Sequence, residues 1–116
     1  MAELSPPPVP KKLREMLKDY PRHIERLQEQ LSRVAEEPKS VSPKFEVAIW
    51  MLEGQLEEFI HEAQAELSAA REGKNDGMIA MAEEKETLMF RARSSNGGMK
   101  GLHDLWDYFK QNEDAI

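Results

Sequence analysis

The chain has 116 residues and a mass of 13.4 kDa, which is the size of one small domain. It contains no cysteine, and this excludes disulfide bonds, thiolate zinc sites and cysteine nucleophiles. Its formal net charge of −6 disfavours binding to nucleic acid, because phosphate contacts need a basic surface. No apolar run is long enough to span a membrane, and the acidic, proline-rich start is unlike a secretory signal. We therefore expect a cytoplasmic protein.

The first third of the chain predicts a tail and two helices. Residues 1–10 contain four prolines, which remove backbone donors and cannot continue a helix, so we expect a flexible tail. Residues 11–20 form a short amphipathic stretch that Pro21 ends, because proline disfavours helical geometry in the residue before it. A second helix is expected over 21–36, where apolar residues share one face: Ile24, Leu27, Leu31 and Val34.

The strongest pattern in the sequence predicts a long helix over about 43–72. Ser42 and Pro43 are typical of a helix start, and Gly73 is expected to stop the helix. Thirty helical residues span about 45 Å. That is too long for a globule of this size, so the distal half is expected to project or to pair with a second copy. The apolar stripe consists of Phe45, Ala48, Ile49, Leu52, Leu56, Phe59, Ile60, Ala63, Leu67 and Ala70.

The opposite side of this helix is apolar only in its first half, where Val47, Trp50, Met51 and Gly54 lie. We expect the first three turns to be buried on two sides and the later turns on one. Glycine inside a helix costs about 1 kcal/mol relative to alanine. Close approach of another backbone would explain Gly54, and the alternative is a solvent-facing glycine with no role. Residues 43–72 also carry 2 basic and 7 acidic side chains, which face either water or a basic partner.

The last third predicts two further helices. Asn75 or Asp76 is expected to cap a helix over 78–93, although residues 87–93 fit an extended segment as well. Glycine and serine residues then break the chain before a last helix over 99–111, and residues 112–116 are expected to fray. The fold class is therefore all-α, an irregular helical bundle of four to five helices around the long one. Residues 11–111 form its single domain.

Two groups of residues suggest chemistry that the rest of the chain supports poorly. Glu58, His61 and Glu62 have the spacing of a helical metal site, which would imply a metal-dependent helical enzyme. Such sites need a second Glu/His pair, which this sequence lacks. Arg91, Arg93 and Lys100 form a basic cluster that would suit a nucleic-acid-associated regulator, but three charges count little against the overall balance.

Methionine is the one enriched residue type, with seven in the chain. It either fills gaps in a core or lines an adaptable groove for a partner. We expect a non-enzymatic protein–protein interaction module, such as an adaptor, inhibitor or regulatory protein, that forms a homodimer through the long helix. No cofactor and no small-molecule substrate is expected. The predicted partner-binding residues are Val47, Trp50, Met51, Gly54, Met78, Met81 and Met89.

Overall fold

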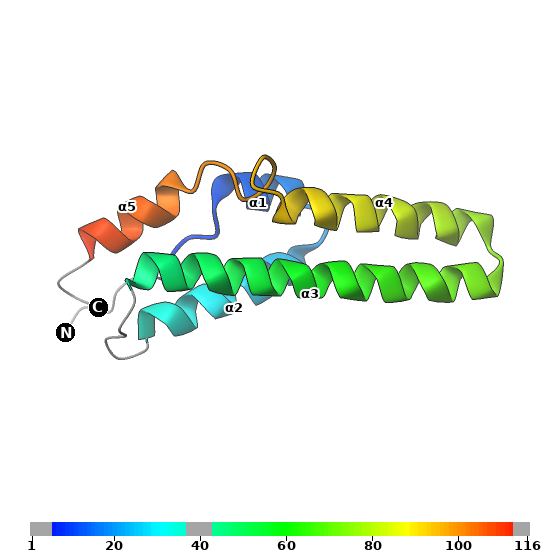
Figure 1. Cartoon of the computed structure of the whole chain (residues 1–116), viewed down its shortest axis with the longest axis horizontal. Helices are drawn as coiled ribbons and strands as arrows, with labels where there is room; N and C mark the ends of the chain where they lie inside the picture. The colour runs from blue at the N-terminus through cyan, green and yellow to red at the C-terminus, as the bar shows by residue number, and fades with distance from the viewer. Residues whose placement is uncertain (1–5, 37–42, 113–116) are drawn as a thin grey trace.

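The computed structural model describes residues 6–36 and 43–112. This part of the chain contains no strand and five helices, α1 (Lys11–Met16), α2 (Pro21–Glu36), α3 (Lys44–Gly73), α4 (Asp76–Arg93) and α5 (His103–Gln111). The molecule measures 55 × 25 × 23 Å, and α3 follows its long axis (Figure 1). The predicted all-α bundle around one long helix is confirmed. None of the helices within the described ranges combines the length and the apolar character that crossing a bilayer requires.

The helices α3 and α4 form an antiparallel hairpin whose turn differs in detail from the prediction (Figure 1). The helix α3 ends at Gly73, one residue beyond the expected range. The left-handed residue that follows is Lys74, with φ 53° and ψ 32°, although glycine is the residue that adopts this conformation without strain. Asn75 caps α4 as predicted, since its Oδ1 accepts a hydrogen bond of 3.1 Å from the backbone N–H of Met78.

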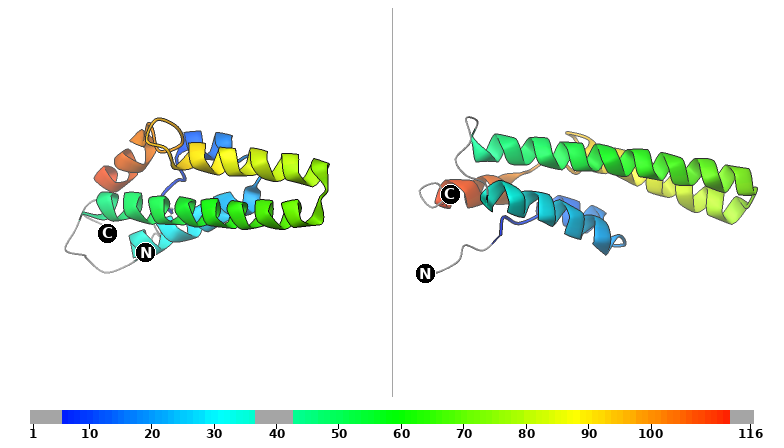
Figure 2. Two further views of the ribbon diagram at one scale, coloured as in Figure 1. Left: turned by 45° about the vertical axis from the view of Figure 1, so that its right-hand side comes forward. Right: turned by 90° about the horizontal axis from the view of Figure 1, so that it is seen from below.

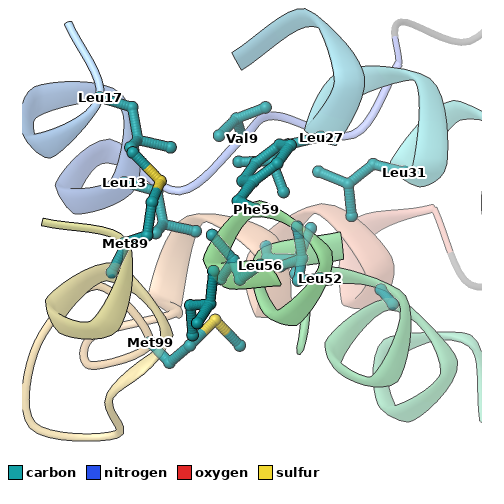
Figure 3. Close-up of a cluster of buried hydrophobic side chains, with 14 of the residues drawn as sticks. Val9, Leu13, Leu17, Leu27, Leu31, Leu52, Leu56, Phe59, Met89 and Met99 are labelled. Atoms are coloured by element: carbon teal, nitrogen blue, oxygen red, sulfur yellow. The ribbon is translucent and has the colours of Figure 1, made fainter. Parts of the chain in front are cut away.

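The main core lies where α1 and α2 cover one side of the hairpin. Figure 2 shows both helices stacked against the hairpin over the half nearest α5, while the other half projects beyond them. Every helix contributes buried side chains, and each large one stabilises the fold by about 1.5–3 kcal/mol relative to full exposure. Figure 3 shows the centre of this core, which includes Leu13, Leu17, Leu27, Leu31, Leu52, Leu56, Phe59 and Met89.

A second, much smaller core holds the projecting half of the hairpin together. It consists of Leu67 and Ala70 on α3 and Ala82 on α4, with half-buried Ile79 packed against them. Two of its three buried members are alanines, so this satellite core removes little apolar surface from water. The distal half of the hairpin is therefore held by far fewer apolar contacts than the half that carries α1 and α2.

The described part of the proline-rich start is packed, which differs from the expected flexible tail. Pro7, Val9 and Pro10 are buried, and Val9 belongs to the main core. Their backbone carbonyls are used as well, since Pro7 accepts a hydrogen bond of 2.7 Å from Gln28 Nε2 and Val9 accepts one of 2.9 Å from Arg14 Nε. Residues 6–10 therefore belong to the folded domain. Residues 1–5, 113–116 and Ser42 lie outside the described ranges.

Two helix boundaries near the ends of the chain were wrong. The first helix ends at Met16, earlier than predicted, and the last begins at His103 rather than at residue 99. The segment before α5 instead folds back onto the end of α4, where the Gly98 N–H donates to the Arg91 carbonyl at 3.0 Å. A Cβ on Gly98 would lie 2.5 Å from Leu13 Cδ2 and 2.8 Å from Ala92 Cα, so this close approach requires glycine. Residues 87–93 are helical, which removes the extended alternative.

Candidate interaction surfaces

The first candidate surface is the back of α3 near its start. We call it the Trp50 patch and define it as Val47, Trp50, Met51 and Gly54. Trp50 is 56% exposed, whereas Val47 and Met51 are half-buried and rest against the main core. The expected burial of these turns on two sides is thus only partial. An exposed tryptophan on a half-apolar helix face is typical of a residue that becomes buried when a partner binds.

Gly54 is the open point of the Trp50 patch. It is exposed, and a Cβ built on it would meet no atom within 4 Å. The expected close approach of another backbone therefore does not occur within the described chain. Trp50 lies one helical turn before Gly54 on the same side of α3, because residues four apart in a helix are neighbours. A bulky apolar side chain and an open helix backbone thus sit next to each other.

The second candidate surface lies at the far end of the hairpin. We call it the tip patch and define it as Ala69, Gly73, Met78 and Met81, all of which are exposed. Met78 is 58% exposed and Met81 is 70% exposed, the largest fraction among the exposed large apolar side chains of the described residues. Methionine has no polar group that needs water, and its flexible thioether adapts to irregular surfaces. These two side chains are therefore available to a partner.

The tip patch begins where the covering layer of α1 and α2 ends. Tyr20 stands at the junction of these two helices, and Lys85 of α4 lies 5.2 Å from its ring centroid. Lys85 Nζ also binds Glu66 of α3, at 3.0 and 2.9 Å from the two carboxylate oxygens. Met81 lies one turn from Lys85 towards the tip, on the same side of α4. The side of the hairpin that α1 and α2 cover thus continues, uncovered, into the tip patch.

The predicted partner-binding residues therefore form two surfaces and not one. Trp50 lies near the start of α3 and the tip patch near its end, about 30 Å apart along the helix at 1.5 Å per residue. Met89 belongs to neither surface, because it is fully buried in the main core (Figure 3). Its prediction as a partner-binding residue was wrong, and it has the other role that methionine often has, the filling of a core.

Two of the three predicted metal ligands, Glu58 and Glu62, are paired with an arginine. Arg26 of α2 donates two hydrogen bonds to the Glu62 carboxylate, at 2.8 and 2.7 Å, and its guanidinium lies 3.5 Å from Glu58. The hydrogen bonding lowers the pKa of Glu62 below its ordinary value. The same guanidinium lies 4.7 Å from the centroid of the Phe59 ring. His61 is exposed, and within the described ranges no three histidine or acidic side chains gather in a way that could hold a metal ion.

The predicted basic cluster is partly neutralised. Arg93 reaches across the hairpin to α3, where its guanidinium lies 3.6 Å from Glu53 and 3.4 Å from Glu57. Arg91 and Lys100 are exposed. Arg93 thus holds α4 against α3, and two of the three predicted cations face solvent.

His23, a half-buried histidine, was not singled out from the sequence. His23 of α2 stacks on Phe59 with ring centroids 4.1 Å apart, and its Nε2 is buried with no hydrogen-bond partner. Burial, followed by the nearby charges of Lys85 and Arg26, lowers the pKa of His23 below its ordinary value. An imidazole that resists protonation fits this place between an aromatic ring and two cations.

Two further exposed aromatic side chains escaped the sequence analysis as surface candidates. Phe90 on α4 is 49% exposed and Trp106 on α5 is 46% exposed. Trp106 packs edge-on against Phe45, with centroids 5.0 Å apart, and Lys110 Nζ lies 5.6 Å from its ring centroid. Phe90 lies off the helix face that Ala82, Met89 and Ala92 share, and this position is the only sequence signal for its exposure. Trp106 shares a helix face with buried Leu105 and Phe109, so periodicity alone predicts its burial.

Comparison with known proteins gives no match to a family model, to a curated protein sequence or to a solved structure.

Proposed function

We propose that this protein is a non-enzymatic helical interaction module that associates with a second copy of itself through α3. The observation that supports this proposal best is the exposure of Trp50 beside the open backbone of Gly54. Neither residue has a role within the described chain that would favour this arrangement. An exposed tryptophan leaves apolar area in water, and a helical glycine costs about 1 kcal/mol relative to alanine.

A crossing of two α3 helices would use both features at once. In a two-fold symmetric pair the same patch serves both copies, so one self-complementary surface is sufficient. Trp50 of one copy would lie over Gly54 of the other, where the missing side chain lets the helices approach. Burial of the exposed part of each indole would contribute about 2 kcal/mol per copy.

The contacts of the polar side chains favour binding over catalysis. The ion pair of Arg26 with Glu62, which has two hydrogen bonds, links α2 to α3. The ion pair of Arg93 with Glu53 links α4 to α3. His23 is stacked on the ring of Phe59, and its Nε2 has no hydrogen-bond partner among the described residues. A nucleic-acid-associated regulator remains the alternative function, and it would depend on Arg91 and Lys100, since Arg93 is already paired.

The test is the solution mass of the wild-type chain and of two matched variants, measured by light scattering at two protein concentrations. We expect the wild type to approach about 27 kDa, twice the chain mass of 13.4 kDa, at the higher concentration. Trp50→Glu should remain monomeric and folded by circular dichroism. Phe90→Glu, which places the same charge at another exposed aromatic position, should still dimerise. A wild type that stays monomeric at both concentrations, or two variants that behave alike, would overturn the proposal.

A further inference from the structure

The tip patch continues an interface that already exists within the protein. In the proximal half of the hairpin, α2 lies along α3 and packs Leu27 and Leu31 into the main core (Figure 3). Next to these apolar contacts, Arg26 pairs with Glu62. The interface thus accepts an amphipathic helix that supplies an apolar stripe and a basic side chain. Beyond Tyr20 the same side of the hairpin has no such cover within the described residues.

The side chains of the tip patch suit the close approach of a helix. Ala69 and Gly73 give α3 a low surface one to two turns beyond Glu66, so a helix can lie near its backbone. Met78 and Met81 stand on the neighbouring helix and can adapt to the apolar side chains of an incoming partner. Small residues on one helix beside exposed methionines on its neighbour are typical of surfaces that bind an amphipathic helix.

The negative charge around the tip patch determines which kind of helix can bind there. Residues 66–86 carry six acidic and three basic side chains, a net charge of −3. Glu72, Asp76 and Glu84 are exposed around the patch. A second copy would bring the same negative tip against this one, which like-charge repulsion disfavours. A basic helix would gain from the same charges, as Arg26 does beside Glu62.

We propose that the tip patch binds a basic amphipathic helix of a partner protein, aligned with α2 along α3. This surface is separate from the Trp50 patch, so the proposal does not depend on self-association. Together the two surfaces would make the protein an adaptor, with a dimer contact near the start of α3 and a partner contact near its end. The patch covers seven residues of α3 beyond Glu66, about 10 Å, so we expect weak, micromolar binding.

The probe is a synthetic peptide of about 14 residues, roughly four helical turns, built from leucine and lysine with the leucines at helical spacing. A peptide of the same composition with alternating leucine and lysine, and a leucine–glutamate peptide with helical spacing, are the controls. Binding is measured by fluorescence anisotropy at low and high salt. We expect the helical basic peptide to bind most tightly, and more weakly as salt rises.

Variants then locate the binding site. Met78→Gln combined with Met81→Gln keeps side-chain length and helix propensity, and it should weaken peptide binding about tenfold because the two apolar contacts are lost. Glu84→Gln should reduce the salt dependence of peptide binding, because it removes one negative charge beside the patch. Phe90→Gln, at an exposed residue of the same helix outside the patch, should leave binding unchanged, and Trp50→Glu should abolish the dimer but not peptide binding. Equal binding of the acidic peptide, or an unaffected methionine double variant, would overturn the proposal whatever the result for the dimer.

Discussion

Replacement of Gly54 by alanine should change stability and self-association in opposite directions. A Cβ at this position meets no atom within 4 Å, so the added methyl group causes no clash inside the chain. Alanine also restricts the unfolded chain and favours the helix, which together stabilise the monomer by about 0.8–1 kcal/mol. For a domain of this length that corresponds to a rise in melting temperature of about 4 °C.

The same methyl group should weaken the proposed dimer. It would stand between the two α3 backbones at their crossing point, and we expect the dimer dissociation constant to rise about tenfold, or about 1.4 kcal/mol. Gly73→Ala is the matched control, because Gly73 is also helical and open. It should stabilise the chain by a similar amount without changing the dimer.

The two effects are measured separately. Urea unfolding on the Trp50→Glu background reports the stability of the monomer without association, and analytical ultracentrifugation of the otherwise unchanged chain reports the dimer. If Gly54→Ala and Gly73→Ala raise stability equally and both leave the dissociation constant unchanged, no second backbone approaches Gly54. If Gly54→Ala lowers the stability of the Trp50→Glu monomer, the added methyl group must clash within the chain, which would contradict the open space around Gly54.

Three further predictions concern the fold. Gly98→Ala should destabilise the chain by about 1–3 kcal/mol in urea unfolding, since the new methyl group would meet Leu13 and the backbone of Ala92; wild-type stability would refute the close approach. Lys74→Gly should stabilise it by about 0.5–1 kcal/mol and Lys74→Ala should not, because only glycine relieves the left-handed strain; equal midpoints would contradict this. The pKa of His23 is lowered in the fold, so as pH falls the unfolded chain is protonated at His23 before the folded chain is. The free energy of unfolding is therefore highest above the ordinary histidine pKa and decreases as pH drops through about 6.5. His23→Gln should flatten the stability profile between about pH 7 and 5, and an unchanged slope would show that His23 does not titrate differently in the fold.

The regular spacing of apolar residues was sufficient to predict the helices, because each one keeps a single face towards the core. The helix α3 ends at Gly73, but Lys74 rather than glycine takes the left-handed conformation that follows the helix end. Residues 99–102 were assigned to a helix because Met99 and Leu102 continue its stripe. Hydrogen bonds between this segment and the end of α4 hold it in a turn instead.

The candidate surfaces were less predictable, because periodicity shows which residues share a face and not how far the neighbouring helices extend. Met78 and Met89 lie on nearly the same side of α4, yet Met78 is exposed and Met89 is buried. The difference arises because α1 and α2 cover α4 only as far as Tyr20, which contacts Lys85. The sequence pattern of α4 alone does not show where this cover ends. Trp50 was correctly placed on the back of its helix, but only the arrangement of the other helices shows how much of it remains exposed.

The satellite core of two alanines and a leucine implies that the hairpin has a gradient of local stability along its length. Amide hydrogens near Leu67 and Ala82 should exchange with solvent through partial openings that leave the main core intact, whereas those near Leu56 should require unfolding of nearly the whole domain. The tip would then behave as a separate cooperative unit that opens at low cost. A helix bound there would slow exchange in the tip far more than elsewhere, so exchange rates would map an occupant directly.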